Sequence, residues 1–273
     1  MLKVSVMTYT LMAGPKPCKV EEMPDVAARA GVHAINWVST YGLNPQLARR
    51  MTLDAGLAVG CYTNSLGSYA RAKGEAAALE EAKRLFDETV GVGAPCIMLV
   101  PLPFDDLPDR DEARRRWCGF LPRLAELAHQ AGVILTIENY QGAASPFVRA
   151  AELMEAVKAV PDIRFTFDAG NAATGEDPVK CAKGLEGRIE YVHLKDWTCY
   201  DEPGPGRLPG LTGKYYVDGP IGEGCVDIIG TLRELARQNY NGYADIEYIG
   251  TKYLPVDEVF RAAKWLKETG LAE

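Results

Sequence analysis

The sequence contains few histidines and no excess of basic residues. Three histidines occur among 273 residues, and 30 lysines and arginines stand against 37 aspartates and glutamates, so the formal net charge is −7. A nucleic-acid partner would require a basic face, and none is therefore expected.

Closely spaced cysteines are also missing. The seven cysteines form no C-x-x-C pair; they are Cys18, Cys61, Cys96, Cys118, Cys181, Cys199 and Cys225. Structural zinc sites need cysteine and histidine at close spacing, so we expect no such site. An odd number of scattered cysteines is typical of a reducing compartment, where cysteine mostly acts as a small hydrophobic residue.

Long apolar runs are absent too. No stretch of about 18 apolar residues is available to span a bilayer. The first ten residues, MLKVSVMTYT, enter an alternating strand pattern directly, without the apolar core and small-residue cleavage site of a signal peptide. We therefore expect a soluble, cytoplasmic protein that does not contact a membrane.

The sequence does contain a regular alternation of short β-rich runs and helical segments. The runs predict eight strands, at residues 4–10, 34–39, 58–64, 96–101, 133–139, 164–171, 189–196 and 243–248. Each is followed by an Ala- and Leu-rich stretch with helical spacing, and several of these begin near Asp, Asn or Ser and end at Gly. The pattern predicts an α/β fold, a single (β/α)8 TIM barrel, which needs about 250 residues. An open doubly wound sheet is the alternative, but no G-x-G-x-x-G follows the first strand.

No domain boundary is visible, and we expect residues 1–273 to form one domain. One long segment, residues 198–224, is rich in Gly and Pro and is expected to lack regular secondary structure. A loop of this length in a compact domain is usually a lid or a binding loop, and in a barrel it would cover the mouth. Tyr215 and Tyr216 favour an ordered loop over a disordered insertion.

A residue able to bind a metal ends each of four consecutive predicted strands. The run VILTIE ends in Glu138, RFTFD in Asp168, IEYVH in His193 and YADIE in Glu247. In a parallel barrel these ends meet on one rim, where three carboxylates repel one another unless their pKa values rise or a divalent cation neutralises them. Three carboxylates and one imidazole suit an octahedral Mn²⁺, Mg²⁺ or Co²⁺ with positions open for water or substrate. The sequence therefore predicts one divalent metal site.

Each of these residues taken alone has a simpler interpretation. A single Glu or Asp at a strand end is usually a helix cap or a solvated loop residue, and a single histidine is more often hydrogen-bonded in the core than bound to a metal. His33 and His129 fit that interpretation and are expected to be structural. Four such residues at four successive strand ends favour a metal site over coincidence.

Five short motifs resemble those of a known superfamily. TIEN, FDAGN, VHLKD, GEGCVD and DIEY resemble the pattern of the sugar phosphate isomerase/epimerase superfamily of xylose isomerase-like barrels. The resemblance implies that Glu138, Asp168, His193 and Glu247 bind Mn²⁺ or a similar ion, and that the two glutamates also serve as an acid/base pair. The superfamily includes ketose 3-epimerases, hydroxypyruvate isomerases, inosose isomerases and dehydratases, and endonuclease IV. Three histidines cannot supply the histidine-rich three-metal cluster of endonuclease IV, which is therefore excluded.

Three positions depart from the usual pattern of the superfamily, and they bear on the substrate. Asn171 stands where many members carry a histidine three residues after the Asp ligand. The second predicted strand offers Asn36 and Trp37 where many members end in Glu, and Lys195 follows His193 where the ketose epimerases have Arg.

Four residues are predicted to contact the substrate: Lys195, Asn171, Tyr9 and Trp197. Side chains alternate along a strand, so Lys195 faces the same side as His193. Its ammonium would bind a substrate hydroxyl or carboxylate, or protonate a leaving group, and pairing with a neighbouring carboxylate is an equal alternative. Tyr9 and Trp197 would form an apolar wall for a sugar, with burial in the ordinary core as the alternative. Asp196 is expected to be a cap or an anchor.

These features together predict a metal-dependent isomerase or epimerase that acts on a small keto sugar or polyol ketone. Chelation of the carbonyl acidifies the neighbouring C–H, and Glu138 and Glu247 would remove and return the proton. A lyase, either an inosose-type dehydratase or a keto-glycoside eliminase, is the first alternative. A barrel that binds a sugar without turning it over is the second. A small carbohydrate is the expected partner, and a homo-oligomer is possible.

Overall fold

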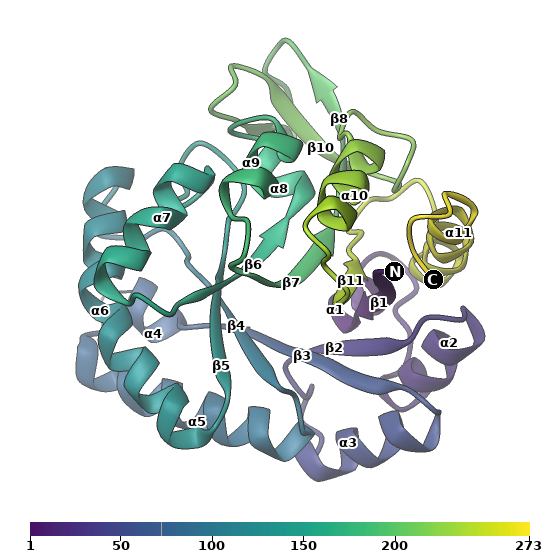
Figure 1. The fold of residues 1–273 in the computed structure, drawn as a ribbon, viewed down its shortest axis with the longest axis horizontal. Coiled ribbons are helices and arrows are strands. Elements are labelled where there is room, and N and C mark those ends of the chain that lie inside the picture. The colour runs from purple at the N-terminus through teal and green to yellow at the C-terminus, as the bar shows by residue number, and fades with distance from the viewer. Residues whose placement is uncertain (72) are drawn as a thin grey trace.

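The centre of the protein is a closed barrel of eight parallel strands, in the order β1-β11-β7-β6-β5-β4-β3-β2 around the ring (Figure 1). The computed structural model describes residues 1–71 and 73–273. The barrel strands are β1 (Lys3–Met7), β2 (Ala34–Val38), β3 (Ala58–Ser65), β4 (Cys96–Val100), β5 (Ile134–Glu138), β6 (Arg164–Asp168), β7 (Ile189–Leu194) and β11 (Tyr243–Ile246). The predicted (β/α)8 TIM barrel is confirmed.

Helices connect the strands and form an outer ring around the barrel (Figure 1). They are α1 (Thr8–Met12), the short 3-10 helix η1 (Val20–Glu22), α2 (Met23–Arg29), α3 (Pro45–Asp54), α4 (Gly67–Ala70), α5 (Glu75–Val92), α6 (Arg110–Ala131), α7 (Ala150–Ala159), α8 (Ala169–Ala173), α9 (Pro178–Gly184), α10 (Ile228–Arg237) and α11 (Pro255–Glu268). The long helix α6 begins at Asp109, whose carboxylate accepts hydrogen bonds from two first-turn N–H groups, and ends at Gly132 in the left-handed conformation. No helix in the described residues is both long enough and apolar enough to cross a membrane.

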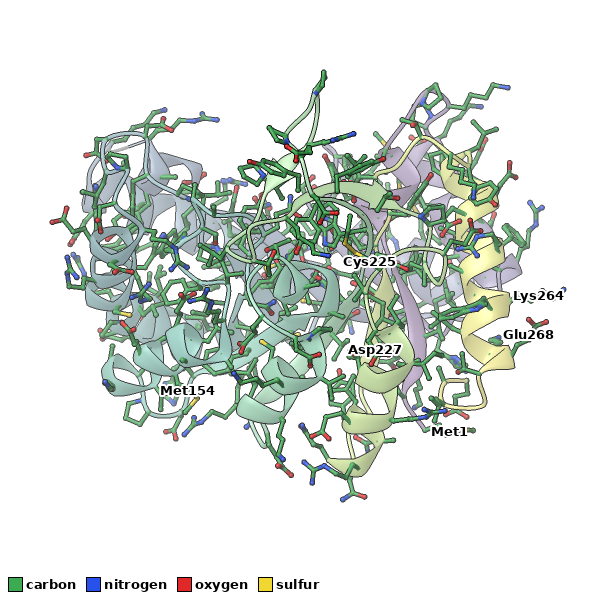
Figure 2. All side chains as sticks on the ribbon, turned by 90° about the horizontal axis from the view of Figure 1, so that it is seen from above. Met1, Met154, Cys225, Asp227, Lys264 and Glu268 are labelled. Atoms are coloured by element: carbon green, nitrogen blue, oxygen red, sulfur yellow. A yellow bond between two sulfur atoms is a disulfide. The ribbon has the colours of Figure 1, made fainter. Side chains whose placement is uncertain are left out.

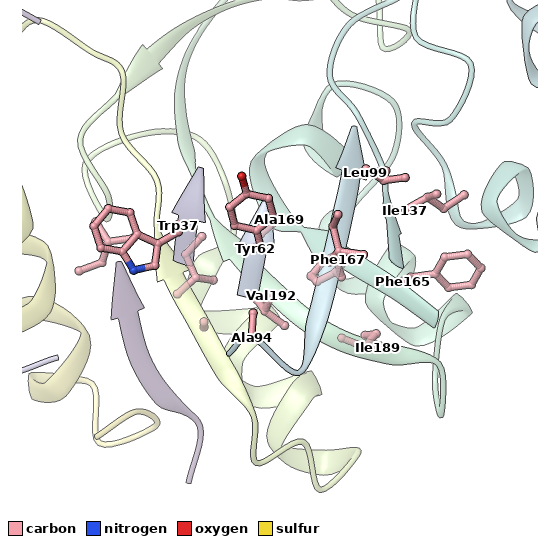
Figure 3. Close-up of a cluster of buried hydrophobic side chains, with 14 of the residues drawn as sticks. Trp37, Tyr62, Ala94, Leu99, Ile137, Phe165, Phe167, Ala169, Ile189 and Val192 are labelled. Carbon is pink, nitrogen blue, oxygen red and sulfur yellow. The ribbon is translucent and has the colours of Figure 1, made fainter. Parts of the chain in front are cut away.

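Alternation of side chains along each strand divides the core into two parts. Ile137 of β5 and Phe167 of β6 are buried among the hydrophobic side chains that Figure 3 shows. Thr136 and Thr166, one residue before each of them, face the barrel interior, where their hydroxyl oxygens lie 2.7 Å apart. Because the period of a strand is two, the last residues of β5 and β6 also point inward.

The segment 198–224 contains regular structure, so the expectation that it lacks any was wrong. A three-stranded antiparallel sheet is formed by β8 (Asp196–Tyr200), β9 (Leu208–Pro209) and β10 (Tyr215–Gly219). Except for Pro209 and Gly219, the Gly and Pro residues of this segment lie between or after these strands, and β10 carries the run YYV, which suits a strand. The sheet projects from the ring beside α8 and α10 (Figure 1).

A disulfide joins Cys199 of β8 to Cys225, which precedes α10. This pair departs from the expectation that cysteine mostly acts as a small hydrophobic residue. The cysteines that remain free in the structure are Cys18, Cys61, Cys96, Cys118 and Cys181. The backbone N–H of Cys225 donates to the carbonyl oxygen of Trp197 at 2.7 Å, so the return of the chain after β10 brings the two sulfurs together. Figure 2 labels Cys225 at the base of the projecting sheet.

Seven of the eight predicted strands end one to three residues earlier than expected. β1 ends at Met7 and β6 at Asp168, and a short helix follows each of them directly. Tyr9 and Asn171 therefore lie on helices α1 and α8 rather than on strands. β7 ends at Leu194, and Asp196 already belongs to β8.

Candidate metal centre

Glu138, Asp168, His193 and Glu247 converge inside one end of the barrel. Each offers a ligand atom, and these four atoms all lie within 4.8 Å of one another. Asp168 and His193 are directly paired in register between β6 and β7. Glu247 follows β11 by one residue and lies two residues beyond Asp245, the register partner of His193. All four side chains are buried, which is possible for so many acidic groups only if something neutralises their charge.

The imidazole of His193 has a carboxylate on each side. Its Nδ1 lies 2.8 Å from Glu138 Oε1 and 3.4 Å from Glu247 Oε2, so Nδ1 is the nitrogen that faces the cluster. Its Nε2 lies 3.5 Å from Asp245 Oδ2. A histidine that binds a metal usually donates its other N–H to a carboxylate or carbonyl. The groups nearest to Nε2 are Asn36 Nδ2, which is hydrogen-bonded to it at 3.3 Å, and the carboxylate of Asp245.

Asp245 was not identified from the sequence, although it has the same inward orientation as Glu247 two residues later. Its carboxylate accepts hydrogen bonds from Ser5 Oγ at 2.6 Å, Tyr191 OH at 2.9 Å and Asn36 Nδ2 at 2.6 Å. The period of two along β11 was the available signal, because an apolar strand rarely has an acidic residue facing the barrel interior. The donors could not be found in this way, since they come from β1, β7 and β2.

The electrostatics of the cluster favour a bound cation. Burial raises the pKa of Asp168 well above its usual range, and the charges of Glu247 and Glu138 raise it further. Burial also raises the pKa of Glu138, although the hydrogen bond from His193 opposes this. The pKa of His193 is lowered by burial, but Glu138 and the other nearby carboxylates outweigh burial and raise it to about 10. Without a cation, the cluster therefore retains protons to reduce its charge.

The donor set and one unpartnered atom fit a divalent ion. Oδ2 of Asp168 is buried and has no hydrogen-bond partner in the described residues, although its Oδ1 accepts from the backbone N–H of Asn171 at 2.7 Å. Three carboxylates and one imidazole are the ligands that Mn²⁺, Mg²⁺ and related ions prefer. The four residues could therefore hold one such ion.

A cavity of about 320 Å³ opens above the cluster. It is lined by Met7, Tyr9, Val38, Thr63, Ser65, Met98, Val100, Leu102, Glu138, Tyr140, Gln141, Lys195, Glu247 and Ile249. Of the four converging residues, only Glu138 and Glu247 line this cavity. Asp168 and His193 are fully buried beneath it, so a molecule in the cavity reaches the two glutamates first.

Lys195 lines the same cavity and is paired there. Its Nζ donates to Glu247 Oε1 at 2.8 Å and to Gln141 Oε1 at 2.9 Å, and lies 3.8 Å from Asp218 Oδ1. Burial lowers the pKa of Lys195, but the carboxylates of Glu247 and Asp218 outweigh burial and raise it above its usual range. Nζ also lies 4.9 Å from the centre of the Trp197 ring. The expected pairing with a neighbouring carboxylate is therefore present, and contact of Lys195 with a substrate stays a prediction.

The other three predicted substrate contacts lie in different surroundings. Tyr9 lines the cavity and is 43% exposed. Trp197 is buried outside the cavity lining, where its Nε1 donates to the carbonyl oxygen of Gly170 at 2.7 Å. Asn171 is also buried outside that lining and holds Asp168 through its backbone. Their roles toward a substrate stay predictions.

Known proteins resemble both the sequence and the fold. A family model described as "Xylose isomerase-like TIM barrel" matches residues 24–269. The "Putative L-ribulose-5-phosphate 3-epimerase SgbU" of Escherichia coli (strain K12) is 32% identical over 163 residues, which cover 58% of this chain and 54% of that protein. An inosose dehydratase of Geobacillus kaustophilus (strain HTA426) is 30% identical over 138 residues, which cover 46% of this chain and 42% of that protein. The chain thus spans about half the length of the curated relatives it matches.

The solved structure of an L-ribulose 3-epimerase has the same fold. It superposes with a TM-score of 0.78, covering 98% of this chain and 94% of that one. The sequence identity is 15%, so this likeness concerns the fold alone.

Proposed function

Because the chain belongs to the xylose isomerase-like TIM barrel family, we propose that it is a metal-dependent isomerase or epimerase of a small keto sugar or polyol ketone. The observation that carries the proposal is that Glu138 and Glu247 line one cavity directly above a buried ligand set. Relatives named as a 3-epimerase and a dehydratase support chemistry on sugars or polyols.

Glu138, Asp168, His193 and Glu247 would hold one divalent ion, with Mn²⁺ as the first choice and Mg²⁺ or Co²⁺ as alternatives. When bound, the ion supplies Lewis-acid polarisation of a substrate carbonyl and of the hydroxyl beside it. The unpartnered Oδ2 of Asp168 supports this assignment, because a buried carboxylate oxygen without a donor is costly.

The two glutamates would move the proton. Glu138 is the last residue of β5 and Glu247 follows β11, with β6 and β7 between these strands in the ring, so the two glutamates reach the cavity from different directions. One carboxylate takes the proton from the carbon next to the carbonyl, and the other returns a proton. Return to the opposite face of the same carbon inverts that centre, whereas return to the neighbouring carbon isomerises the sugar. Lys195 orients Glu247 through its 2.8 Å hydrogen bond.

Proton exchange tests this proposal. The Mn²⁺-loaded protein, incubated with a panel of ketoses in D₂O, should incorporate deuterium at the carbon next to the carbonyl. Glu138→Gln and Glu247→Gln should each reduce turnover by about 10²–10⁴-fold, the usual range for an acid/base group, with the metal content measured in parallel. Glu190→Gln is the matched control, since Glu190 lies in β7 but pairs with Arg164 outside the cavity. A protein that binds ketoses but exchanges no proton would be a sugar-binding barrel, and the proposal would fail.

A lyase is the second candidate, and the position of Lys195 favours it. Elimination requires a proton for the departing oxygen, and Lys195 is a cation that lines the cavity. In a lyase, Lys195→Met should abolish elimination while proton exchange continues. In an epimerase, the same change should chiefly raise KM. We expect the second result, and a metal-loaded variant that exchanges the proton but forms no product would contradict it.

A further inference from the structure

The ammonium group of Lys195 at the cavity is already paired with other side chains of the protein. Among the described residues, Lys195 is the one lysine or arginine that lines the cavity above the cluster. Its ammonium is shared by Glu247, Gln141 and, at 3.8 Å, Asp218. A substrate anion would have to displace these partners to reach it.

The groups around the cavity are also acidic as a set. The carboxylates of Glu247 and Asp218 lie beside the ammonium of Lys195, and those of Glu138 and Asp168 belong to the adjoining cluster. Four carboxylates against one ammonium and one divalent cation leave a net negative charge. A phosphate group carries about −1.5 to −2 charges at neutral pH. Charges of the same sign repel each other, so this set disfavours a phosphorylated substrate.

The backbone position that could hold a phosphate is filled by the protein itself. Barrel enzymes often bind phosphate with the loops that follow strands seven and eight, through backbone N–H groups. Here the carboxylate of Asp196 accepts from the N–H groups of Gly222 at 2.9 Å, Gly224 at 2.9 Å and Val226 at 3.0 Å. Asp196 is buried, so an internal carboxylate occupies this anion site, which lies outside the cavity lining. Asp196 therefore anchors the segment 222–226 rather than a residue of the candidate metal centre.

The half of the ring opposite the acidic strands is mainly aliphatic. The cavity residues contributed by β1 to β4 and the turn after β4 are Met7, Val38, Thr63, Ser65, Met98, Val100 and Leu102. Two of these are polar, and the Thr63 hydroxyl is buried without a hydrogen-bond partner in the described part of the chain. This half suits C–H groups and a hydroxyl, and it offers no charge for an anion.

Resting on the proposed function, we propose that the substrate is an uncharged keto sugar or polyol ketone, without a phosphate or carboxylate group. Two independent observations support it: the paired Lys195 and the aliphatic half of the cavity. The metal end takes the carbonyl and its neighbouring hydroxyl, and the far end of the molecule lies against β1 to β4.

Matched pairs of sugars test this inference. The Mn²⁺-loaded protein is given D-xylulose and D-xylulose 5-phosphate, and D-fructose and D-fructose 6-phosphate, and deuterium incorporation from D₂O is followed for each. The unphosphorylated member of a pair should react with a kcat/KM at least about 100-fold higher, as expected where like charges meet. An equal or higher value for the phosphorylated member would overturn the inference.

A charge added to the aliphatic half provides the decisive variant. Ser65→Arg places a cation in the cavity and should raise the ratio of phosphorylated to unphosphorylated kcat/KM by about 10-fold or more. Ser65→Gln adds a polar side chain without the charge and should leave the ratio unchanged. If Ser65→Arg leaves it unchanged as well, charge does not decide the preference and the inference is wrong.

A measurement of sugar binding distinguishes a failure of this inference from a failure of the proposed function. If no ketose exchanges its proton, the proposed function fails, and calorimetric titration of the same sugar pairs into the Mn²⁺-loaded protein replaces the kinetic comparison. Tighter binding of the unphosphorylated sugar then supports an uncharged ligand. Tighter binding of the phosphorylated sugar, or no binding of either, overturns the inference.

Discussion

At the scale of single residues, the orientation of His193 depends on a neighbour that does not line the cavity. Asp245 faces Nε2 of the imidazole, while Nδ1 faces Glu138. This carboxylate is itself held by donors from Ser5, Asn36 and Tyr191. When a metal takes Nδ1, the remaining imidazole proton belongs on Nε2, where the carboxylate of Asp245 attracts it.

Asp245→Asn should therefore weaken metal binding by about 10–100-fold, the usual effect of losing such a partner. The measurement is a titration of the metal-free variant with Mn²⁺, with circular dichroism to confirm folding. Ser5→Ala is the matched control, because it removes a donor to the same carboxylate without facing His193. Equal affinities for Asp245→Asn and the wild type would show that Asp245 does not position the imidazole.

Protons and metal compete for His193. Its pKa of about 10 in the metal-free protein lies above the value of about 6.5 expected for the unfolded chain. The stability due to this raised pKa is fully present below pH 6.5 and is lost as the pH rises toward 10. Metal binding must displace the proton, so Mn²⁺ affinity should increase between pH 6 and 8, with proton release detected by calorimetry in two buffers. An affinity independent of pH would contradict a protonated His193.

At the scale of elements, a single buried glutamate connects the start of α7 to α6. Glu152 accepts from the N–H groups of Val148 and Arg149 at 2.8 and 3.0 Å, and its two oxygens pair with Arg110 of α6 at 2.7 and 2.8 Å. Burial raises the pKa of Glu152, but Arg110 and the two N–H groups outweigh burial and lower it. The interaction holds α7 against the barrel on the side that carries β5 and β6.

Glu152→Gln should lower the free energy of unfolding by about 1–3 kcal/mol, since it leaves Arg110 without its carboxylate. Glu155→Gln on the same helix is the control, because its pair with Arg114 is more exposed and should contribute less than about 1 kcal/mol. The lowered pKa of Glu152 stabilises the folded protein above about pH 4.3, the ordinary pKa of glutamate in an unfolded chain. This stabilisation is lost as the pH falls through the pKa of Glu152 in the folded protein, so the two variants should differ less in their free energy of unfolding in acid. Urea unfolding at pH 7 and pH 3.5 measures both effects, and equal losses at pH 7 would show that the burial of Glu152 is unimportant.

At the scale of the whole molecule, one ion would neutralise charge that comes from four different strands. Glu138, Asp168, His193 and Glu247 lie far apart in the chain and meet only when the barrel closes. An ion bound to the folded state and not to the unfolded chain stabilises the fold by mass action, by about 2.7 kcal/mol at a hundred times its dissociation constant.

Chelation should therefore lower the Tm by about 5–10 °C relative to protein saturated with Mn²⁺, using the usual conversion for a chain of this size. Differential scanning calorimetry with and without EDTA makes the comparison. Asp168→Asn should remove most of the difference, because Asp168 provides a ligand atom and does not line the cavity. A Tm that does not respond to metal would leave the buried carboxylates without their proposed counterion.

The sequence predicted those parts of the site that depend on patterns within a few neighbouring residues. The period of two along a strand and the common direction of parallel strands placed Glu138, Asp168 and His193 on one inner rim. Lys195 was assigned to that side for the same reason. Trp197 was expected at the rim too, but β7 ends at Leu194, so its ring faces Gly170 instead. Tyr9 reached the cavity from a helix rather than from the predicted strand.

The sequence by itself determined the barrel and the four converging side chains, because both follow from patterns that repeat within a few residues of the chain. Only the tertiary structure decided the pairing of Lys195 with Glu247, the filling of the anion site by Asp196 and the disulfide of Cys199. It likewise decided that β8, β9 and β10 form a sheet. Each of these joins segments whose distance depends on how the whole chain closes, and no local periodicity encodes such a contact.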